Sequence, residues 1–186
     1  RAWMHDWNRR LARRNAIVKA IAQDGEGRIW IGKDQDGIDV WDKQRATFVA
    51  VAPDEERGGE RGLQTGTINV LYADGSDMMW VGTNKKGVSY YHESIYKFGI
   101  KLLGDVNSIE EGVDGCLWLG TNGGGLIRWN PATGEKRTYT HSGGQSIAGD
   151  IVVSLLQASD GKLWIGTYRG GLDCFDGTSF KHYRYQ

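Results

Sequence analysis

The chain has 186 residues with 23 basic and 23 acidic side chains, so its formal net charge at pH 7 is zero. This balance excludes the basic surface that binding to duplex nucleic acid requires. No apolar run approaches the roughly 18–20 residues of a membrane-spanning helix. The composition of 28 Gly, 8 Trp and only 2 Pro favours short strands, tight turns and a large aromatic side chain in every structural unit.

The first 15 residues differ from the rest of the chain. They contain five Arg and a single acid, Asp6, together with two Trp. A basic amphipathic helix is one interpretation of residues 1–15, and the end of a preceding, incomplete unit is the one that we favour. No leader peptide is visible at Arg1, so we expect either a processed leader or a start inside a longer chain.

Four similar units follow, and each is predicted to contain four short strands. In the first unit, apolar residues alternate or cluster in four short runs, and turns rich in Gly and Asp separate them. The other three units repeat this order, which predicts antiparallel meanders. The strands expected in the first unit are Ile17–Ala22, Ile29–Gly32, Ile38–Trp41 and Thr47–Val51. The units span about 16–51, 67–100, 105–140 and 150–186.

One motif recurs in every unit. It has Trp, an aliphatic residue and Gly in a row, a second Gly seven places after the Trp, and an aromatic residue eleven places after it. The Trp spacings of 50, 38 and 46 residues match the roughly 40–50-residue period of β-propeller blades. We therefore predict an all-β fold of about four four-stranded antiparallel blades, forming a single partial propeller domain over residues 1–186. The repeated Trp residues are Trp30, Trp80, Trp118 and Trp164.

The repeated residues are expected to be structural. Trp gives each contact between blades a large apolar side chain. The Gly two places later leaves room for a close approach, and the Gly at the seventh place supplies a left-handed turn residue.

These residues resemble a known family. The segment SIAGDIVVSLLQASDGKLWIGTYRGGLDCFDG at Ser146–Gly177 is similar to the two-component regulator propeller repeat, with its pattern D-G-x-[LI]-W-[IVL]-G-T. All four units fit this pattern, over about Ala16–Tyr183. In the first unit Lys33 replaces the usual Thr, and the second has MMW and the single glycine Gly87.

The resemblance implies a periplasmic sensor region of a hybrid two-component system, whose propellers usually have seven blades. The four blades would then form part of a larger seven-bladed propeller. The implied partners are an oligosaccharide or other small polar ligand, and a neighbouring propeller or immunoglobulin-like domain of the parent chain. We also expect self-association, because end blades expose apolar faces. No cofactor, nucleic acid or membrane contact of this segment is expected.

Candidate ligand-binding residues lie between the second and third strands of each unit. The surrounding scaffold repeats while these residues change, which is typical of recognition loops on a fixed frame. Ordinary solvated loops are the alternative. We expect Tyr168 to stack on a sugar ring and Arg169 to bind hydroxyls or a uronate carboxylate. The other candidates are Asp34, Asn84, Lys85, Lys86 and Asn122.

Other motifs are too incomplete to support chemistry. The acids at 34, 36 and 39 lack the distal Glu of a calcium loop. Acidic loop residues cluster only in the first unit, so no acid–base pair for a lyase or glycosidase is indicated. No catalytic residue or metal ligand is therefore predicted. Cys116 and Cys174 lie in different units and are expected to be free thiols.

Three functions are compatible with these patterns. A non-catalytic, ligand-sensing propeller in the periplasm is the function that we predict. A protein-interaction scaffold is the first alternative, and a propeller lyase or glycosidase is the second.

Overall fold

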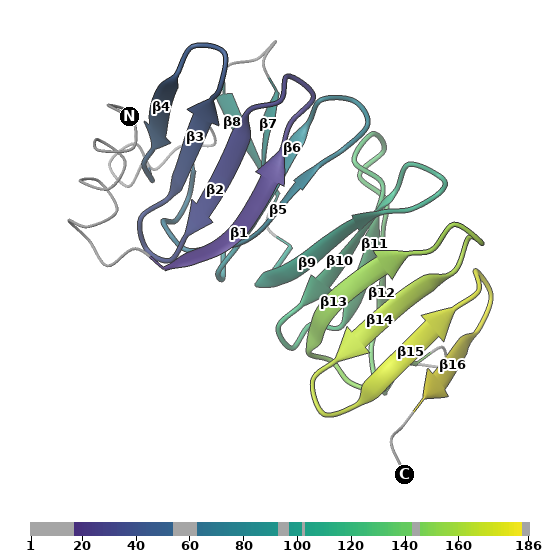
Figure 1. Ribbon diagram of the computed structural model, residues 1–186. Coiled ribbons are helices and arrows are strands. Elements are labelled where there is room, and N and C mark those ends of the chain that lie inside the picture. The colour runs from purple at the N-terminus through teal and green to yellow at the C-terminus, as the bar shows by residue number, and fades with distance from the viewer. Residues whose placement is uncertain (1–16, 54–62, 93–96, 102, 143–145, 184–186) are drawn as a thin grey trace. The chain divides into compact units, whose positions relative to one another are not determined.

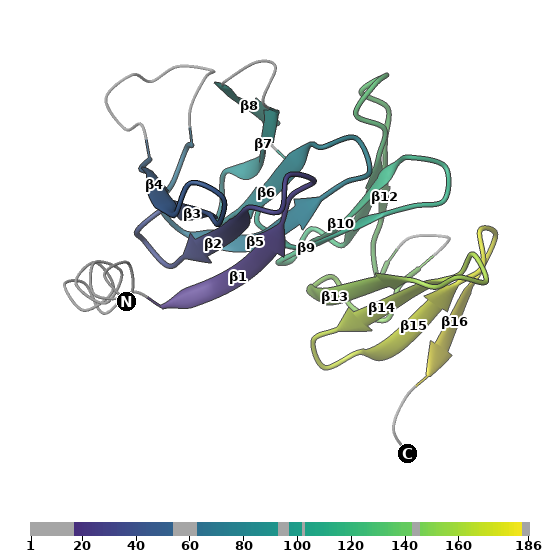
Figure 2. The ribbon, with the colours of Figure 1, turned by 45° about the horizontal axis from the view of Figure 1, so that its top comes forward.

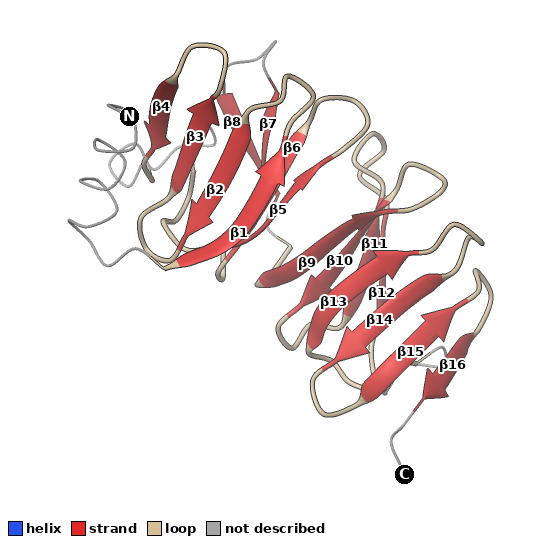
Figure 3. Cartoon of the chain, in the orientation of Figure 1, coloured by secondary structure: helices blue, strands red, loops and turns tan. Residues whose placement is uncertain are grey.

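The computed structural model describes residues 17–53, 63–92, 97–101, 103–142 and 146–183. These residues form strands joined by turns and loops (Figure 3). Within them there is no helix long and apolar enough to cross a membrane. The predicted end of a preceding blade, at residues 1–15, lies outside the described residues.

The strands form four sheets, and each sheet is an antiparallel meander of four strands in chain order (Figure 1). The predicted all-β fold of four-stranded antiparallel blades is confirmed. The predicted strand boundaries differ by at most one or two residues from those observed, because tight turns fix where each strand ends. The chain divides into two compact units, Arg1–Leu102 and Leu103–Gln186. Each of these units contains two of the four sequence repeats, and from here on the word unit refers to such a pair.

The first unit holds two sheets. The inner strands β1 and β5 lie side by side (Figure 2), and Lys19 Nζ donates to Asn69 Oδ1 across them at 2.7 Å. The first sheet comprises β1 (Val18–Gln23), β2 (Ile29–Lys33), β3 (Ile38–Asp42) and β4 (Thr47–Val51). The second comprises β5 (Ile68–Ala73), β6 (Met79–Thr83), β7 (Gly87–His92) and β8 (Lys97–Lys101).

The core of the first unit lies between these two sheets. Trp30 shares one face of the first sheet with its cross-strand partner Val40. Aliphatic residues of the second sheet, such as Leu71 and Val81, pack in the same buried cluster. Trp30 is only 2% exposed, so the predicted role of the repeated Trp in contacts between blades is confirmed here.

The second unit repeats this arrangement, with β9 beside β13. Its core joins Trp118, Leu126 and Tyr139 of one sheet to Ile165 and Phe175 of the other. The third sheet comprises β9 (Val106–Glu111), β10 (Leu117–Thr121), β11 (Leu126–Trp129) and β12 (Lys136–Tyr139). The fourth comprises β13 (Val152–Gln157), β14 (Leu163–Thr167), β15 (Gly171–Phe175) and β16 (Phe180–Tyr183).

The Gly two places after the Trp allows the sheets of one unit to approach closely. A Cβ added to Gly32 would lie 2.6 Å from Ile68 Cγ2, and one added to Gly120 would lie 2.6 Å from Val152 Cγ1. Both distances are too short for real contacts, so any side chain here would push the sheets apart. The predicted close approach at these positions is confirmed.

Trp164 departs from this pattern. It is half-buried and lines an apolar groove of about 430 Å³ together with Leu156 and Leu172. Those two leucines are 59% and 41% exposed. Trp164 therefore lacks the cover that Trp118 receives from the fourth sheet, although the two residues occupy the same place in the repeat.

The two cysteines of this unit, Cys116 and Cys174, are buried and are free thiols, as predicted.

Candidate functional site

The loops between the second and third strands share one backbone geometry. The Gly at the seventh place after each Trp has a positive φ, as predicted, with values from 72° to 94°. The residue five places after the Trp is also left-handed in every copy, although three of the four are not glycine. Their φ values are 67° for Gln35, 60° for Lys85, 60° for Arg169 and 102° for Gly123.

A left-handed residue other than glycine costs free energy, of order 1 kcal/mol or more. Gln35, Lys85 and Arg169 therefore occupy positions where Gly would be better for folding. Such strain is concentrated at ligand-binding and switch sites. Sequence reasoning selected Lys85 and Arg169 as variable loop residues, but the strain emerges only from the backbone geometry.

The Thr that follows the repeated Gly closes the loop. The hydroxyls of Thr83 and Thr121 donate to the carbonyls of Gly87 and Gly125 at 2.8 and 2.7 Å. In the first sheet Lys33 stands at this position. It instead forms an ion pair with Asp39 at 2.9 Å, and both side chains are about 10% exposed. Among the described residues, no three His, Cys, Asp or Glu side chains gather as metal ligands.

In the first unit, Thr67 joins the predicted loop residues. Its hydroxyl donates to Asp34 Oδ1 at 3.1 Å, and its carbonyl accepts the backbone N–H of Asn84 at 3.1 Å. Thr67 begins the second blade, so it links the loops of both blades. Lys85 and Lys86 lie at the exposed tip, while Asp34 and Asn84 are half-buried. The structure therefore brings these four predicted residues together at one end of this unit.

Ile151 has the same role in the second unit. It forms a β-bridge with Asn122, and its carbonyl accepts the backbone N–H of Tyr168 at 2.8 Å. The Asn122 amide also donates to Asp105 Oδ2 at 3.2 Å. Asn122, Tyr168 and Arg169 are all exposed on loops held by these hydrogen bonds. We call these three residues, with Ile151, the loop end of the second unit.

Tyr168 and Arg169 are in contact with each other. Tyr168 is 54% exposed, and the guanidinium carbon of Arg169 lies 5.1 Å from the centroid of its ring. A guanidinium stacked on a ring keeps its in-plane N–H donors available for a ligand. The aromatic surface and the cationic donors are therefore presented side by side.

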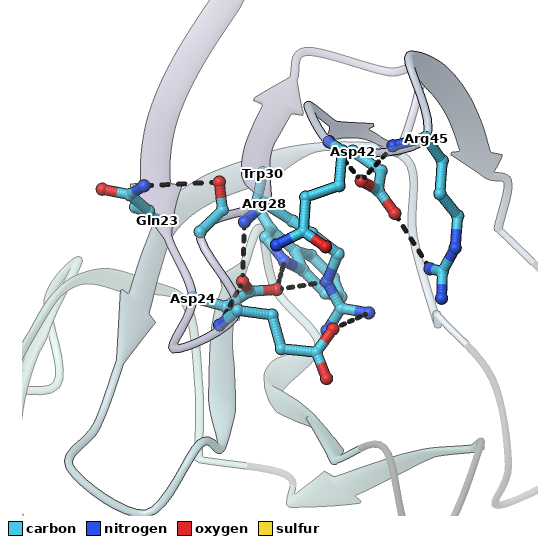
Figure 4. A network of polar contacts seen from close by, with 9 residues as sticks. Gln23, Asp24, Arg28, Trp30, Asp42 and Arg45 are labelled. Atoms are coloured by element: carbon cyan, nitrogen blue, oxygen red, sulfur yellow. Dashed lines mark hydrogen bonds and ion pairs between the residues drawn. The ribbon is translucent and has the colours of Figure 1, made fainter.

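Carboxylates at the opposite ends of the strands were not selected from the sequence. Asp24 Oδ2 accepts both the indole N–H of Trp30 and Nε–H of Arg28 at 2.7 Å (Figure 4), and Asp74 accepts from Trp80 in the same way. Burial raises the pKa of Asp24, but the hydrogen bonds from Trp30 and Arg28 outweigh it and hold the pKa below its ordinary value. The sequence feature that could have indicated these carboxylates is an Asp six places before the repeated Trp, which occurs at Asp24 and Asp74.

Comparison with protein families gives a match to the two-component regulator propeller at residues 13–32 and 146–169. The second match covers the loop that carries Tyr168 and Arg169. No curated protein matched the sequence.

Solved structures share the fold. The extracellular domain of a proposed hybrid two-component system of B. thetaiotaomicron is 24% identical, with a TM-score of 0.79, over 90% of this chain and 24% of that one. The extracellular domain of a proposed one-component system of the same organism is 25% identical, with a TM-score of 0.72, over 91% of this chain and 22% of that one. The chain thus spans about a quarter of the length of these domains.

An enzyme also has this architecture. Virginiamycin B lyase from Staphylococcus aureus is 14% identical, with a TM-score of 0.69, over 90% of this chain and 55% of that one. At this identity the likeness concerns the fold alone, because one fold can carry unrelated functions.

Proposed function

Because this chain carries two-component regulator propeller repeats, we propose that it is part of the extracytoplasmic sensor region of a two-component system. In this proposal the propeller binds a carbohydrate or similar polar ligand and relays binding without converting the ligand. The parent protein would supply a histidine kinase and the remaining blades of a seven-bladed propeller. The similarity to two extracellular domains of B. thetaiotaomicron, which extends over 90% and 91% of this chain, supports this proposal.

The observation that carries ligand recognition is the pairing of Tyr168 and Arg169. Tyr168 offers an exposed ring for the apolar face of a sugar, and Arg169 offers donors for hydroxyl groups. Asn122, joined to the same loop through Ile151, adds an amide. Because strained backbone and cross-blade hydrogen bonds fix this geometry, binding would require little further ordering of the loop.

The loop end of the first unit is proposed to add polar contacts. Lys85 and Lys86 are exposed cations, and Asp34 and Asn84 stand behind them, connected through Thr67. A catalytic propeller would require an acid and a base that converge on one bound atom. At this loop end Asp34 accepts the Thr67 hydroxyl, and in this proposal it holds the loops together and takes no part in proton transfer.

Relay requires a contact that ligand binding can change. We propose that the groove beside Trp164 packs against a further sheet of the same repeat, in the parent chain or in a second copy. The equivalent face around Trp118 is covered by aliphatic residues of the fourth sheet, among them Val152 and Ile165. An uncovered apolar face of this kind promotes association, so the isolated chain should pair or aggregate weakly.

Calorimetry with uncharged oligosaccharides tests this function. Wild type should bind at least one member of a neutral oligosaccharide panel, and Tyr168→Ala should weaken binding by roughly 10-fold, as loss of an aromatic stacking contact of about 1–1.5 kcal/mol implies. Val49→Ala is the matched control, because Val49 is 57% exposed and lies in the middle of β4.

Three outcomes would contradict the proposal. Equal affinity of wild type and Tyr168→Ala would remove the loop end from the site. Release of new reducing ends or unsaturated sugars during the titration would show turnover and favour the lyase or glycosidase alternative. Binding of a protein partner in place of every glycan would favour a scaffold.

A further inference from the structure

A second cleft lies in the second unit, at the ends of the strands opposite to Tyr168 and Asn122. It has a volume of about 250 Å³. Its walls come from both sheets of the unit, with Arg128, Arg137 and Tyr139 on one side and Gln157 and Phe175 on the other. This is below the roughly 300–1,000 Å³ of pockets for drug-sized ligands, so the cleft fits a single sugar-sized ring.

The cleft contains two arginines that are direct neighbours. Arg128 of β11 and Arg137 of β12 are cross-strand partners in the antiparallel register, so both side chains leave the sheet on the same face. Like charges directly opposite each other destabilise a sheet. Of the described residues that line the cleft, only Asp114 is acidic, and it forms an ion pair with Arg128.

The other copies of the repeat do not place two arginines here. The corresponding pair is Val40 with Val49 in the first sheet and Cys174 with Lys181 in the fourth. A blade therefore folds without this charge pair. The two arginines are a departure of one copy from its scaffold, and blade packing does not explain them.

Both guanidinium groups are positioned by aromatic rings. The guanidinium carbon of Arg137 lies 4.9 Å from the Tyr139 ring centroid, and that of Arg128 lies 6.0 Å from the Trp118 ring centroid. Tyr139 and Trp118 are buried and pack on Phe175, so the platform beneath the cations is rigid. Stacked guanidinium groups keep their in-plane donors, which match the two oxygens of a carboxylate.

We infer that this cleft binds a small carboxylate carried on a sugar-sized ring, that is, a uronate. The carboxylate would lie between Arg128 and Arg137. The Nε2 of Gln157 donates to the Lys162 carbonyl at 3.3 Å, so its amide oxygen would accept from a hydroxyl group of the ring. The site is separate from the loop end at Tyr168 and does not depend on a sensor role. It selects for negative charge, whereas the loop end is tested above with uncharged oligosaccharides.

Thermal unfolding and calorimetry with D-glucuronate and D-galacturonate test the inference on the full chain. The melting temperature of wild type should rise with either uronate, whereas glucose and galactose at the same concentration should leave it unchanged. Raising the salt concentration should weaken the effect. In Arg137→Gln the affinity should fall by about 10- to 100-fold, as loss of a charge-assisted hydrogen bond predicts.

Lys43→Gln, at an exposed turn between β3 and β4, should keep full uronate affinity and serves as the matched control. The inference is overturned if no uronate shifts the wild-type melt, if glucose acts as strongly as glucuronate, or if Arg137→Gln responds like wild type. Loss of uronate binding in Arg169→Gln would also overturn it by moving the site to the loop end.

Discussion

Replacing Trp118 by Ala should cause a large loss of stability in the second unit. Trp118 is 5% exposed and contacts Tyr139 and Phe175 with ring centroids 5.9 and 5.6 Å away. Burial of about 150–250 Å² of aromatic surface at about 25 cal/mol per Å² corresponds to about 4–6 kcal/mol. Measured losses for buried Trp→Ala changes are about 3–5 kcal/mol, and we expect a value in this range.

Trp164→Ala is the matched perturbation, because both Trp residues occupy the same position in the repeat. Trp164 is half-buried and lines the open groove, although its ring still contacts Tyr183 at 5.6 Å. Because a larger part of its ring stays exposed, we expect a smaller loss than at Trp118, of about 2–3 kcal/mol. The sequence alone predicts equal losses for the two residues, so the structure changes this expectation.

Urea denaturation followed by far-UV circular dichroism measures both losses, at low protein concentration so that association through the groove is negligible. Lys85→Ala, at an exposed loop tip, should change stability by less than about 0.5 kcal/mol. Equal losses for the two Trp variants would refute the argument that cover by a neighbouring sheet determines the contribution of this residue.

Two further predictions follow from individual contacts. Gly120→Ala should destabilise the second unit by about 1–3 kcal/mol, because its Cβ would lie 2.6 Å from Val152 Cγ1, whereas Gly75→Ala, with no atom within 4 Å of the added Cβ, should be nearly neutral in the same urea titration. The lowered pKa of Asp24 in the folded state contributes stability above its unfolded pKa of about 3.9, and this is lost as the pH falls through the folded value. Asp24→Asn should therefore lose stability less steeply than wild type below about pH 4 in acid unfolding experiments, and an unchanged slope would contradict the assigned hydrogen bonds.

The sequence by itself determined the blade. Local chemistry accounts for this, because the Trp, the two glycines and the alternating apolar residues each act within about a dozen positions. Glycines such as Gly87 and Gly125 have the left-handed φ expected of their place in the repeat. The predicted loop residues also lie at the strand ends where the repeat placed them, since turn positions follow directly from strand positions.

Only the tertiary structure decided what each copy of the motif does. Trp118 and Trp164 have the same local sequence, and their burial differs because one face has a neighbouring sheet and the other has a groove. The links through Thr67 and Ile151 join loops that are 50 residues apart (Asp34 and Asn84) and 46 residues apart (Asn122 and Tyr168). Contacts over such separations leave no local pattern in the sequence. Likewise, Arg128 and Arg137 become neighbours only through the register of β11 and β12, and a register depends on turn length and on the packing of the whole sheet.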